Sequence, residues 1–375
     1  MGYPFRFRNG IYACASEQYV TVPNVGVRGP YAAGIPPIVR GANGRKMIQV
    51  EEAVTNALAY SRRQDLWISY NTPIITLNVA DPVGGLSACT IEDNDAASQE
   101  YIGRNSSLAA GIRVFQIYVK YNNYRYYWHD MSSGDERIST FDFQTDTDGA
   151  FPGYVPTYYG HVSLGSWKLL YLMYSDAGAG LRNCCICPAR ASDLTHQSVT
   201  PVGIVTAWEP LVSNIHHIPS IITTGSDAVT KAKSEFYFPA AKIPAMLRKR
   251  FSYDVMPYWS TAMLASQRYQ WQSANVGAGW TQYCYIATDG TLVITDTSHG
   301  DYIVTSPITF APFSLVNLAF DADAGTVTVS GAAGGNGTYT GTAWPAATGD
   351  LWWGMGTSAV QQFNGCIGEP IIAWN

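Results

Sequence analysis

Several familiar signatures are missing from this sequence. No run approaches the roughly 20 apolar residues of a membrane-spanning helix, and the first residues lack the apolar core of a secretory signal peptide. The Gly-x-Ser-x-Gly nucleophile elbow and the His-Glu-x-x-His zinc helix are absent as well. We therefore expect no membrane insertion, synthesis in a cytoplasm without an export signal, and neither of these two kinds of hydrolase.

Charge is also scarce. Only 14% of the residues are charged, and 28 acidic residues against 23 basic ones give a formal net charge of −5. Nucleic-acid binding needs a basic surface that displaces counterions. The one basic cluster, Arg248-Lys249-Arg250, is short and is typical of a solvated linker. We expect no nucleic-acid partner.

The cysteines are odd in number and mostly isolated, which is typical of reduced, buried thiols. They are Cys14, Cys89, Cys184, Cys185, Cys187, Cys284 and Cys366. The cluster at 184–187 leaves a zinc site as an alternative. Because neighbouring strand residues point to opposite faces, and no second Cys or His pair stands at finger spacing, we favour core thiols and expect no cofactor.

What is present favours β-structure. Aromatic residues make up 13% of the chain, and aromatic and β-branched side chains suit a pleated sheet. Residues 282–288 and 291–295 alternate in polarity around Asp289-Gly290, a pair that predicts a hairpin with a type I′ turn. Residues 314–320 and 326–330 predict a second strand pair.

The closing residues 363–374, Phe-Asn-Gly-Cys-Ile-Gly-Glu-Pro-Ile-Ile-Ala-Trp, end such a series of strands. This phrase resembles the last strands of laminin G-like and concanavalin A-like jelly rolls. The resemblance covers about the last third of the chain. It implies a jelly-roll module over residues 244–375.

A second resemblance begins at Ala42-Asn-Gly-Arg45 and continues through Gln49-Val-Glu-Glu to Trp67. This leader is similar to one in structural proteins of tailed bacteriophages, where it opens a carbohydrate-binding-module-like β-sandwich. Residues 111–120, 161–174 and 181–189 resemble later strands of that module, which implies a domain over 47–243. Spacing alone predicts a helix over 49–66, whereas the resemblance implies an extended segment.

Residues 1–46 are rich in Gly, Pro and Tyr, and their prolines exclude a long helix. We expect an extended arm that either lies along its own domain or docks on a neighbouring subunit. The predicted fold is therefore all-β: an arm at 1–46 followed by two β-sandwich, jelly-roll modules at 47–243 and 244–375.

Catalytic residues are hard to find. The Glu-x-Asp-x-x-Glu strand of jelly-roll glucanases is missing, Glu369 has no acidic neighbour in sequence, and His216 and His217 would point to opposite faces of an extended segment. We expect no enzymatic activity. Calcium is the one metal we consider, with Asp146 and Asp148 as best candidates and residues 92–95 and 321–323 as weaker ones.

Sugar binding needs exposed aromatic rings beside hydrogen-bonding side chains. Two aromatic clusters fit this need, and alternation puts neighbouring rings on opposite faces, so that some would be core. The candidates are Tyr124, Arg125, Tyr126 and Trp128 in the first cluster and Trp352 and Trp353 in the second. Core or subunit-interface roles remain open for all of them, since aromatics also dominate protein interfaces.

These observations favour a non-enzymatic virion structural protein of a bacteriophage, exposed on the particle as capsid decoration or as a tail-fibre component. It would assemble with other virion proteins through its arm and sheet edges, as a homotrimer. The alternative is an adhesion protein that binds a cell-surface or environmental polysaccharide. A polysaccharide depolymerase would need a facing carboxylate pair.

Overall fold

The structure, a computed structural model, consists almost wholly of β-strands, which confirms the predicted all-β sandwich class. Its only helices among the described residues are short 3₁₀ turns: η1 (Phe7–Asn9), η2 (Gln64–Leu66), η3 (Ala240–Lys242) and η5 (Thr261–Met263). The structure describes residues 2–4, 6–98, 100–122, 126–131, 137–151, 153–188, 203–244, 250–264, 266–275, 280–298, 300–334, 337–338, 349–354 and 362–373. Within these, no helix is long and apolar enough to cross a membrane.

The chain divides into two compact units. Unit 1 comprises residues 1–20, 30–53 and 232–375, and unit 2 comprises residues 21–29 and 54–231. The main divisions thus fall at 53/54 and 231/232, whereas the sequence led us to expect 46/47 and 243/244. Most of the expected N-terminal arm belongs to the same unit as the C-terminal third.

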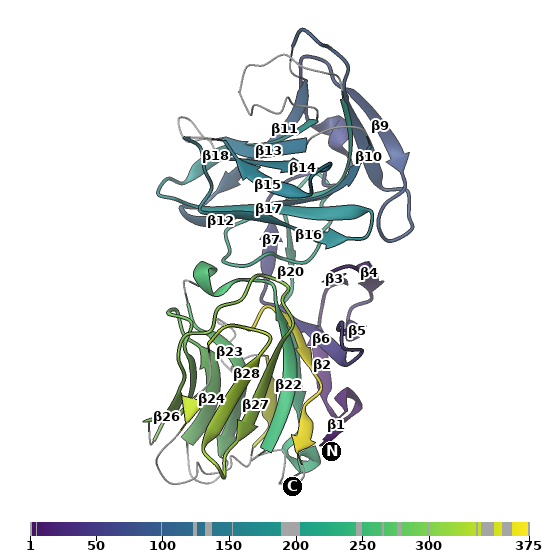
Figure 1. Cartoon of the computed structure of the whole chain (residues 1–375). Coiled ribbons are helices and arrows are strands. Elements are labelled where there is room, and N and C mark those ends of the chain that lie inside the picture. The colour runs from purple at the N-terminus through teal and green to yellow at the C-terminus, as the bar shows by residue number, and fades with distance from the viewer. Residues whose placement is uncertain are drawn as a thin grey trace. The chain divides into compact units, whose positions relative to one another are not determined.

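Unit 1 is built from two antiparallel sheets, whose strands lie in two layers in Figure 1. The first sheet runs in the order β29 (Gly337–Thr338), β28 (Thr326–Ser330), β27 (Val316–Asp321), β22 (Arg250–Pro257), β31 (Gly365–Gly368), β6 (Lys46–Val50), β5 (Ile38–Arg40), with β32 (Ile371–Ala373) joining β22 to β1 (Gly2–Pro4). The second runs β2 (Ile11–Cys14), β21 (Ser234–Phe238), β30 (Leu351–Trp353), β23 (Arg268–Asn275), β24 (Trp280–Ile286), β25 (Leu292–Asp296), β26 (Gly300–Val304).

Aromatic side chains fill the space between these two sheets. Trp353 of β30 is fully buried and lies 4.5 Å, centroid to centroid, from Tyr253 of β22 in the facing sheet. Trp271 packs edge-on against Phe251 at 6.0 Å and against Phe320 at 6.1 Å. Alternation along each strand thus sends one set of rings into the core, which makes unit 1 a β-sandwich.

The N-terminal residues are strands of unit 1. β1 pairs with β32, β2 with β21, and β6 with β31. The turn between β5 and β6 is held by Asp254, a buried carboxylate that accepts hydrogen bonds from Asn43 Nδ2 at 2.8 Å and Arg45 Nη1 at 3.3 Å. Of the two placements left open for this segment, the structure adopts the one along the chain's own unit.

Unit 2 also pairs two antiparallel sheets. One has the order β16 (Tyr158–Leu164), β17 (Trp167–Asp176), β12 (Gly111–Tyr121), β19 (Gly203–Ser213), β10 (Ala88–Asp93), β9 (Ile74–Val79); the other has β15 (Thr147–Ala150), β14 (Arg137–Asp142), β13 (Tyr126–Met131), β18 (Gly180–Pro188), β11 (Tyr101–Leu108), β8 (Ile68–Tyr70). Two strand pairs complete the chain: β7 (Val54–Asn56) with β20 (Val229–Lys231), and β3 (Gln18–Val22) with β4 (Gly26–Tyr31).

The central strand β12 of unit 2 is covered on both faces. Phe115 and Ile117 point into the core that the two sheets share. On the other face, Gln116 donates to the Pro219 carbonyl at 2.8 Å, and the Tyr118 hydroxyl lies 2.7 Å from the Thr21 hydroxyl. A strand buried on both faces reads as a nearly continuous apolar run, which explains the composition of residues 111–120.

The predicted hairpin around Asp289-Gly290 forms between β24 and β25, but with a different turn. Gly290 alone has a positive φ, 86°, and its N–H donates to the Ala287 carbonyl at 2.9 Å. A type I′ turn would need positive φ at both central residues. The three-residue loop with one left-handed glycine is instead the type I turn with a G1 bulge. The pair 314–320 and 326–330 forms as β27 and β28, with Val327 and Val329 both buried.

Residues 49–66 form no α-helix. The end of β6, all of β7 and the 3₁₀ turn η2 occupy this segment, in agreement with the extended conformation that the phage-protein resemblance implies. The seven cysteines are free and buried, which agrees with the prediction of core thiols. No group of three or more His, Cys, Asp or Glu side chains suited to a metal occurs among the described residues.

Candidate functional site

The outer face of the second sheet of unit 1 carries a row of aromatic rings. In β30, Leu351 and Trp353 are buried and Trp352 between them is partly exposed. Trp352 lies opposite Tyr237 on one neighbouring strand and opposite Gln272 on the other. Gln272 in turn lies opposite Tyr283. Because directly opposed residues share a face in an antiparallel sheet, these side chains form one row across four strands.

The rings in this row contact one another. Tyr237 and Trp352 stack at a centroid distance of 4.6 Å and an interplanar angle of 30°. Tyr269 lies 5.6 Å from Tyr283 and 5.8 Å from Tyr285. All five rings are partly exposed. We call the set Tyr237, Tyr269, Tyr283, Tyr285 and Trp352 the aromatic face.

Polar groups accompany the rings. Gln267 donates to the Tyr269 hydroxyl at 2.9 Å, and burial raises the pKa of Tyr269, so its phenol stays neutral at ordinary pH. Lys233 and Glu235 form an ion pair at the end of β21. With neighbouring strands about 4.8 Å apart, a row across four strands is about 14 Å long. The aromatic face can therefore hold an extended ligand, with ring stacking as the main contact and hydrogen bonds at its margin.

The structure separates the two tryptophans of the second predicted cluster. Trp352 belongs to the aromatic face. Trp353 has no exposed surface, and its indole Nε1 donates to the Gly368 carbonyl at 3.0 Å. Trp353 as a sugar-binding residue was therefore a wrong prediction, because strand alternation makes it part of the core.

The first predicted cluster is only partly described. Tyr124 and Arg125 lie outside the described residues. Tyr126 and Trp128 lie in β13, where Trp128 is opposite Ser139 on one side and Ile186 on the other. Their role in sugar binding stays a prediction.

The two calcium candidates lie in the β14–β15 hairpin of unit 2. Asp146 forms an ion pair with Lys168. Asp148 lies 2.8 Å from His161 Nδ1, and since a carboxylate only accepts, the imidazole N–H is the donor. A calcium ion at Asp146 would have to displace the lysine ammonium. Calcium binding stays a prediction, but these partners compete with it.

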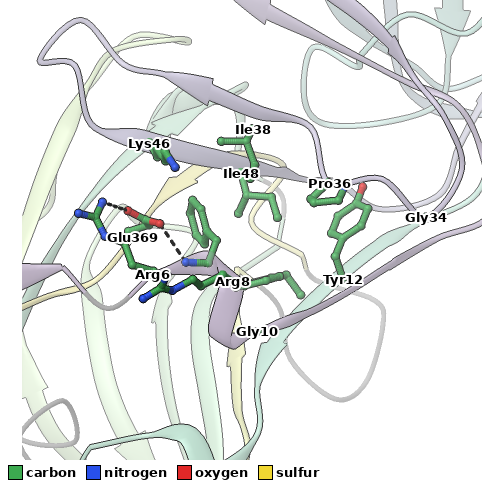
Figure 2. A pocket seen from close by; sticks show the side chains of 12 residues that line it. Arg6, Arg8, Gly10, Tyr12, Gly34, Pro36, Ile38, Lys46, Ile48 and Glu369 are labelled. Atoms are coloured by element: carbon green, nitrogen blue, oxygen red, sulfur yellow. Dashed lines mark hydrogen bonds and ion pairs between the residues drawn. The ribbon is translucent and has the colours of Figure 1, made fainter.

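Glu369 has a structural partner that the sequence did not reveal. Its buried carboxylate accepts hydrogen bonds from the backbone N–H of Phe7 at 2.9 Å and from Arg6 Nη1 at 3.2 Å (Figure 2). The carboxylate thus fastens the N-terminal segment to the end of β31. Phe7 and Glu369 are separated by 362 positions in sequence, which explains why no local pattern signalled the contact.

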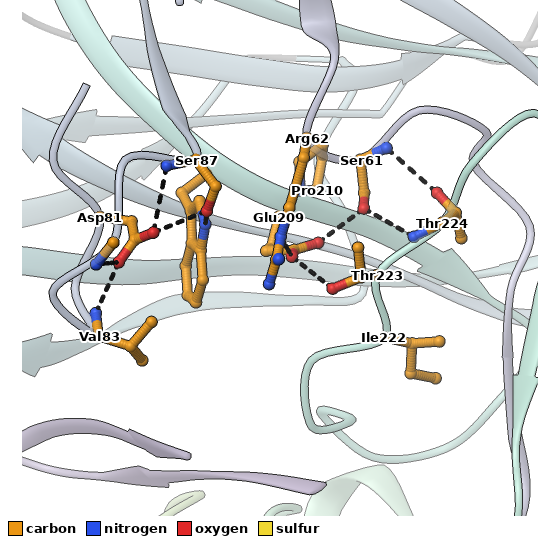
Figure 3. Close-up of polar contacts among 12 residues, drawn as sticks. Ser61, Arg62, Asp81, Val83, Ser87, Glu209, Pro210, Ile222, Thr223 and Thr224 are labelled. Atoms are coloured by element: carbon orange, nitrogen blue, oxygen red, sulfur yellow. Dashed lines mark hydrogen bonds and ion pairs between the residues drawn. The ribbon is translucent and has the colours of Figure 1, made fainter. Parts of the chain in front are cut away.

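A buried acid in unit 2 was also missed. Glu209 of β19 accepts hydrogen bonds from the Ser61 and Thr223 hydroxyls, both at 2.6 Å, and forms an ion pair with Arg62 (Figure 3). Its φ of 46° places it in the left-handed region. Strained residues collect at functional sites, but all three partners already occupy this carboxylate. The only local signal was the phrase Trp208-Glu-Pro210.

Next to this network lies a second fully bonded acid. Trp208 Nε1 donates to the Ser87 hydroxyl at 2.8 Å, and that hydroxyl donates to Asp81 at 2.7 Å (Figure 3). Burial by itself would raise the pKa of Asp81. Hydrogen bonds from the Ser87 hydroxyl and from the N–H groups of Gly85, Val83 and Ser87 outweigh burial, so that the pKa is lowered. Asp81 stays ionised and organises its loop, which is a structural task.

In comparisons with known proteins, neither a family model nor a curated protein matches this chain. The functional argument therefore rests on the geometry above and on the sequence resemblances.

Proposed function

We propose that the protein is a non-enzymatic structural and adhesion protein that binds polysaccharide on the aromatic face of unit 1. The observation that carries the proposal is the row Tyr237, Trp352, Gln272 and Tyr283, with its stacked pair at 4.6 Å. The CH faces of pyranose rings pack on aromatic rings, and flanking side chains hydrogen-bond the hydroxyls. Several rings in line suit a chain of sugars better than a single one.

The contacts of three buried acids support a protein without catalysis. A glycosidase needs one carboxylic acid and one carboxylate free to face each other across a sugar. Glu209, Glu369 and Asp254 are instead each bonded to two or more neighbouring groups. Acids held in this way position backbone and side chains and are poorly placed to exchange protons with a substrate.

The phage-protein resemblance of residues 42–67 supports a place on the surface of a virion. Such a protein would contact other virion proteins, and a homotrimer is the expected state. A second candidate function, assembly, is favoured by unit 2, where the two sheets end on β8 and β9. Ile68 and Ile74 on these strands are 44% and 45% exposed, and open strand edges pair readily with other chains.

The test is binding to a panel of insoluble and soluble polysaccharides with the full chain, its Trp352→Ala variant and a Tyr159→Ala control. Tyr159 is 36% exposed on β16 and lies outside the aromatic face. Loss of a central stacking ring should cost about 1.5–2 kcal/mol, which weakens binding by about 10- to 30-fold. The control should bind like the unaltered chain.

Two results would refute the adhesion proposal: no retention on any polysaccharide, or equal retention of the Trp352→Ala variant. Analytical ultracentrifugation of the same samples addresses assembly. A sedimenting trimer without polysaccharide binding would make assembly the better proposal.

A further inference from the structure

Unit 1 contains a cavity of about 610 Å³, shown in Figure 2. The N-terminal segment, the β5–β6 hairpin with its preceding loop, β21 and the residue after β31 supply its walls. The lining residues that matter for the argument are Arg8, Tyr12, Pro36, Ile38, Lys46 and Glu369. The volume lies within the range of small-molecule sites.

The floor of the cavity is apolar. Phe7, Ile48 and Phe236 are buried, and the rings of Phe7 and Phe236 meet edge to face at 5.4 Å. Gly10 allows this packing, since a Cβ there would lie 2.2 Å from the Phe236 ring. These three side chains form the packed base beneath the cavity. The apolar lining residues that keep exposed surface are Tyr12, Pro36 and Ile38, and they offer a ligand a surface for a ring.

The charge around the floor is positive. Three cationic side chains, Arg6, Arg8 and Lys46, line the cavity with one acid, Glu369. Glu369 forms an ion pair with Arg6 and accepts a hydrogen bond from the Phe7 N–H. Within the described part of the chain, Arg8 and Lys46 have no ion pair or side-chain hydrogen bond. Two unpaired cations in one cavity stand out in a chain with a net charge of −5.

We propose that this cavity binds an acidic monosaccharide unit, a pyranose that carries a carboxylate. The carboxylate would pair with Arg8 and Lys46, since charge-assisted bonds to carboxylates are among the stronger polar contacts. The ring would lie against Tyr12, Pro36 and Ile38, the apolar lining side chains that keep exposed surface. This site is separate from the aromatic face and does not depend on the function proposed for it.

The experiment is isothermal titration calorimetry of the full chain with D-glucuronate, D-galacturonate, D-glucose and inorganic phosphate. At least one uronate should bind, whereas glucose, which lacks the carboxylate, and phosphate, which lacks the ring, should bind at least tenfold more weakly. The double variant Arg8→Gln, Lys46→Gln should lose the uronate by at least tenfold. Both side chains reach the surface, and circular dichroism checks that the variant folds.

Two controls isolate the site. Arg28→Gln removes an exposed arginine outside the cavity and should leave uronate binding unchanged. Trp352→Ala should also leave it unchanged, so the outcome is distinguishable from that for the aromatic face. The proposal is overturned if neither uronate binds, if the double variant binds as well as the unaltered chain, or if phosphate binds as tightly as the uronate, which would mean that the cavity recognises charge alone.

Discussion

Glu209 allows a sharp test of how unit 2 is held together. In the pairing of β12 with β19, Tyr118 lies opposite Trp208 and Gln116 opposite Leu211. Glu209 and Pro210 therefore both face Ile117, which is a β-bulge. Bulges of this kind usually place glycine at a left-handed first position, whereas here a glutamate adopts a φ of 46°. The side-chain network must offset the backbone strain.

The cost of removing that network follows from its contacts. Each of the two hydroxyl bonds to the carboxylate contributes about 1.5 kcal/mol, the lower end of the range for hydrogen bonds to charged groups. We use the lower end because the Ser61 hydroxyl would still accept its bond from the Thr224 N–H after the carboxylate is removed. The Arg62 side chain is 31% exposed, so solvent limits its ion pair to under about 1 kcal/mol. We expect Glu209→Ala to lower the free energy of unfolding by about 3–4 kcal/mol.

Glu209→Gly provides the matched comparison. It removes the same side chain but suits a positive φ, so it should be less destabilising than Glu209→Ala by about 1 kcal/mol. Urea unfolding followed by circular dichroism gives both values, and hydrogen exchange of peptides from β12 and β19 shows that the change lies in unit 2. An alanine variant within 1 kcal/mol of the unaltered chain would refute the network argument. Equal values for alanine and glycine would refute the strain argument.

Two further predictions concern titratable groups. Burial raises the pKa of Asp93 to about 6, so ionisation is penalised in the folded state and stability should fall as pH rises from about 4 to 6. Asp93→Asn should remove that fall, so that relative to the unaltered chain its free energy of unfolding is roughly 2 kcal/mol more favourable at pH 7 than at pH 4. Urea unfolding at both pH values measures this difference. Parallel pH profiles for the variant and the unaltered chain would contradict it. Burial also raises the pKa of Cys89 and Cys366 to about 12. A thiol reagent at pH 8 should label neither in the native protein and both after denaturation, as mass spectrometry of labelled peptides would report; rapid native labelling of either would show that its strand opens.

Strand positions were the most predictable part of the fold, because alternation is a local signal. Residues 326–330 show it well: Val327 and Val329 are buried and the residues between them are not. Residues 49–66 show its limit. Apolar residues at helical spacing there serve β6 and β7, since Val50 and Val54 are each buried by tertiary partners that spacing cannot show.

The candidate site was predictable only in part. Alternation correctly put one of Trp352 and Trp353 inside the core and one outside, but it could not say which, since either assignment satisfies the period of two. Tyr237, Tyr269 and Tyr283 were missed because each is one of 25 tyrosines without a local mark. Only the strand order brings them beside Trp352.

That strand order also explains why the two compact units differ from the ranges expected from the linear sequence. Unit 1 takes β1, β2, β5 and β6 from the first 53 residues, and its remaining strands from residues after 231. β31 pairs with β6 on one side and with β22 on the other. Strands from the first 53 residues therefore share one sheet with strands that begin at residue 250 or later. A proline such as Pro239 or Pro244 shows that a helix cannot continue through it, but it does not show which distant strand lies alongside.

The aromatic face and the cavity both depend on these long-range pairings. Tyr237 precedes the boundary expected at 243/244, and most of the residues that line the cavity belong to the first 48 residues of the chain.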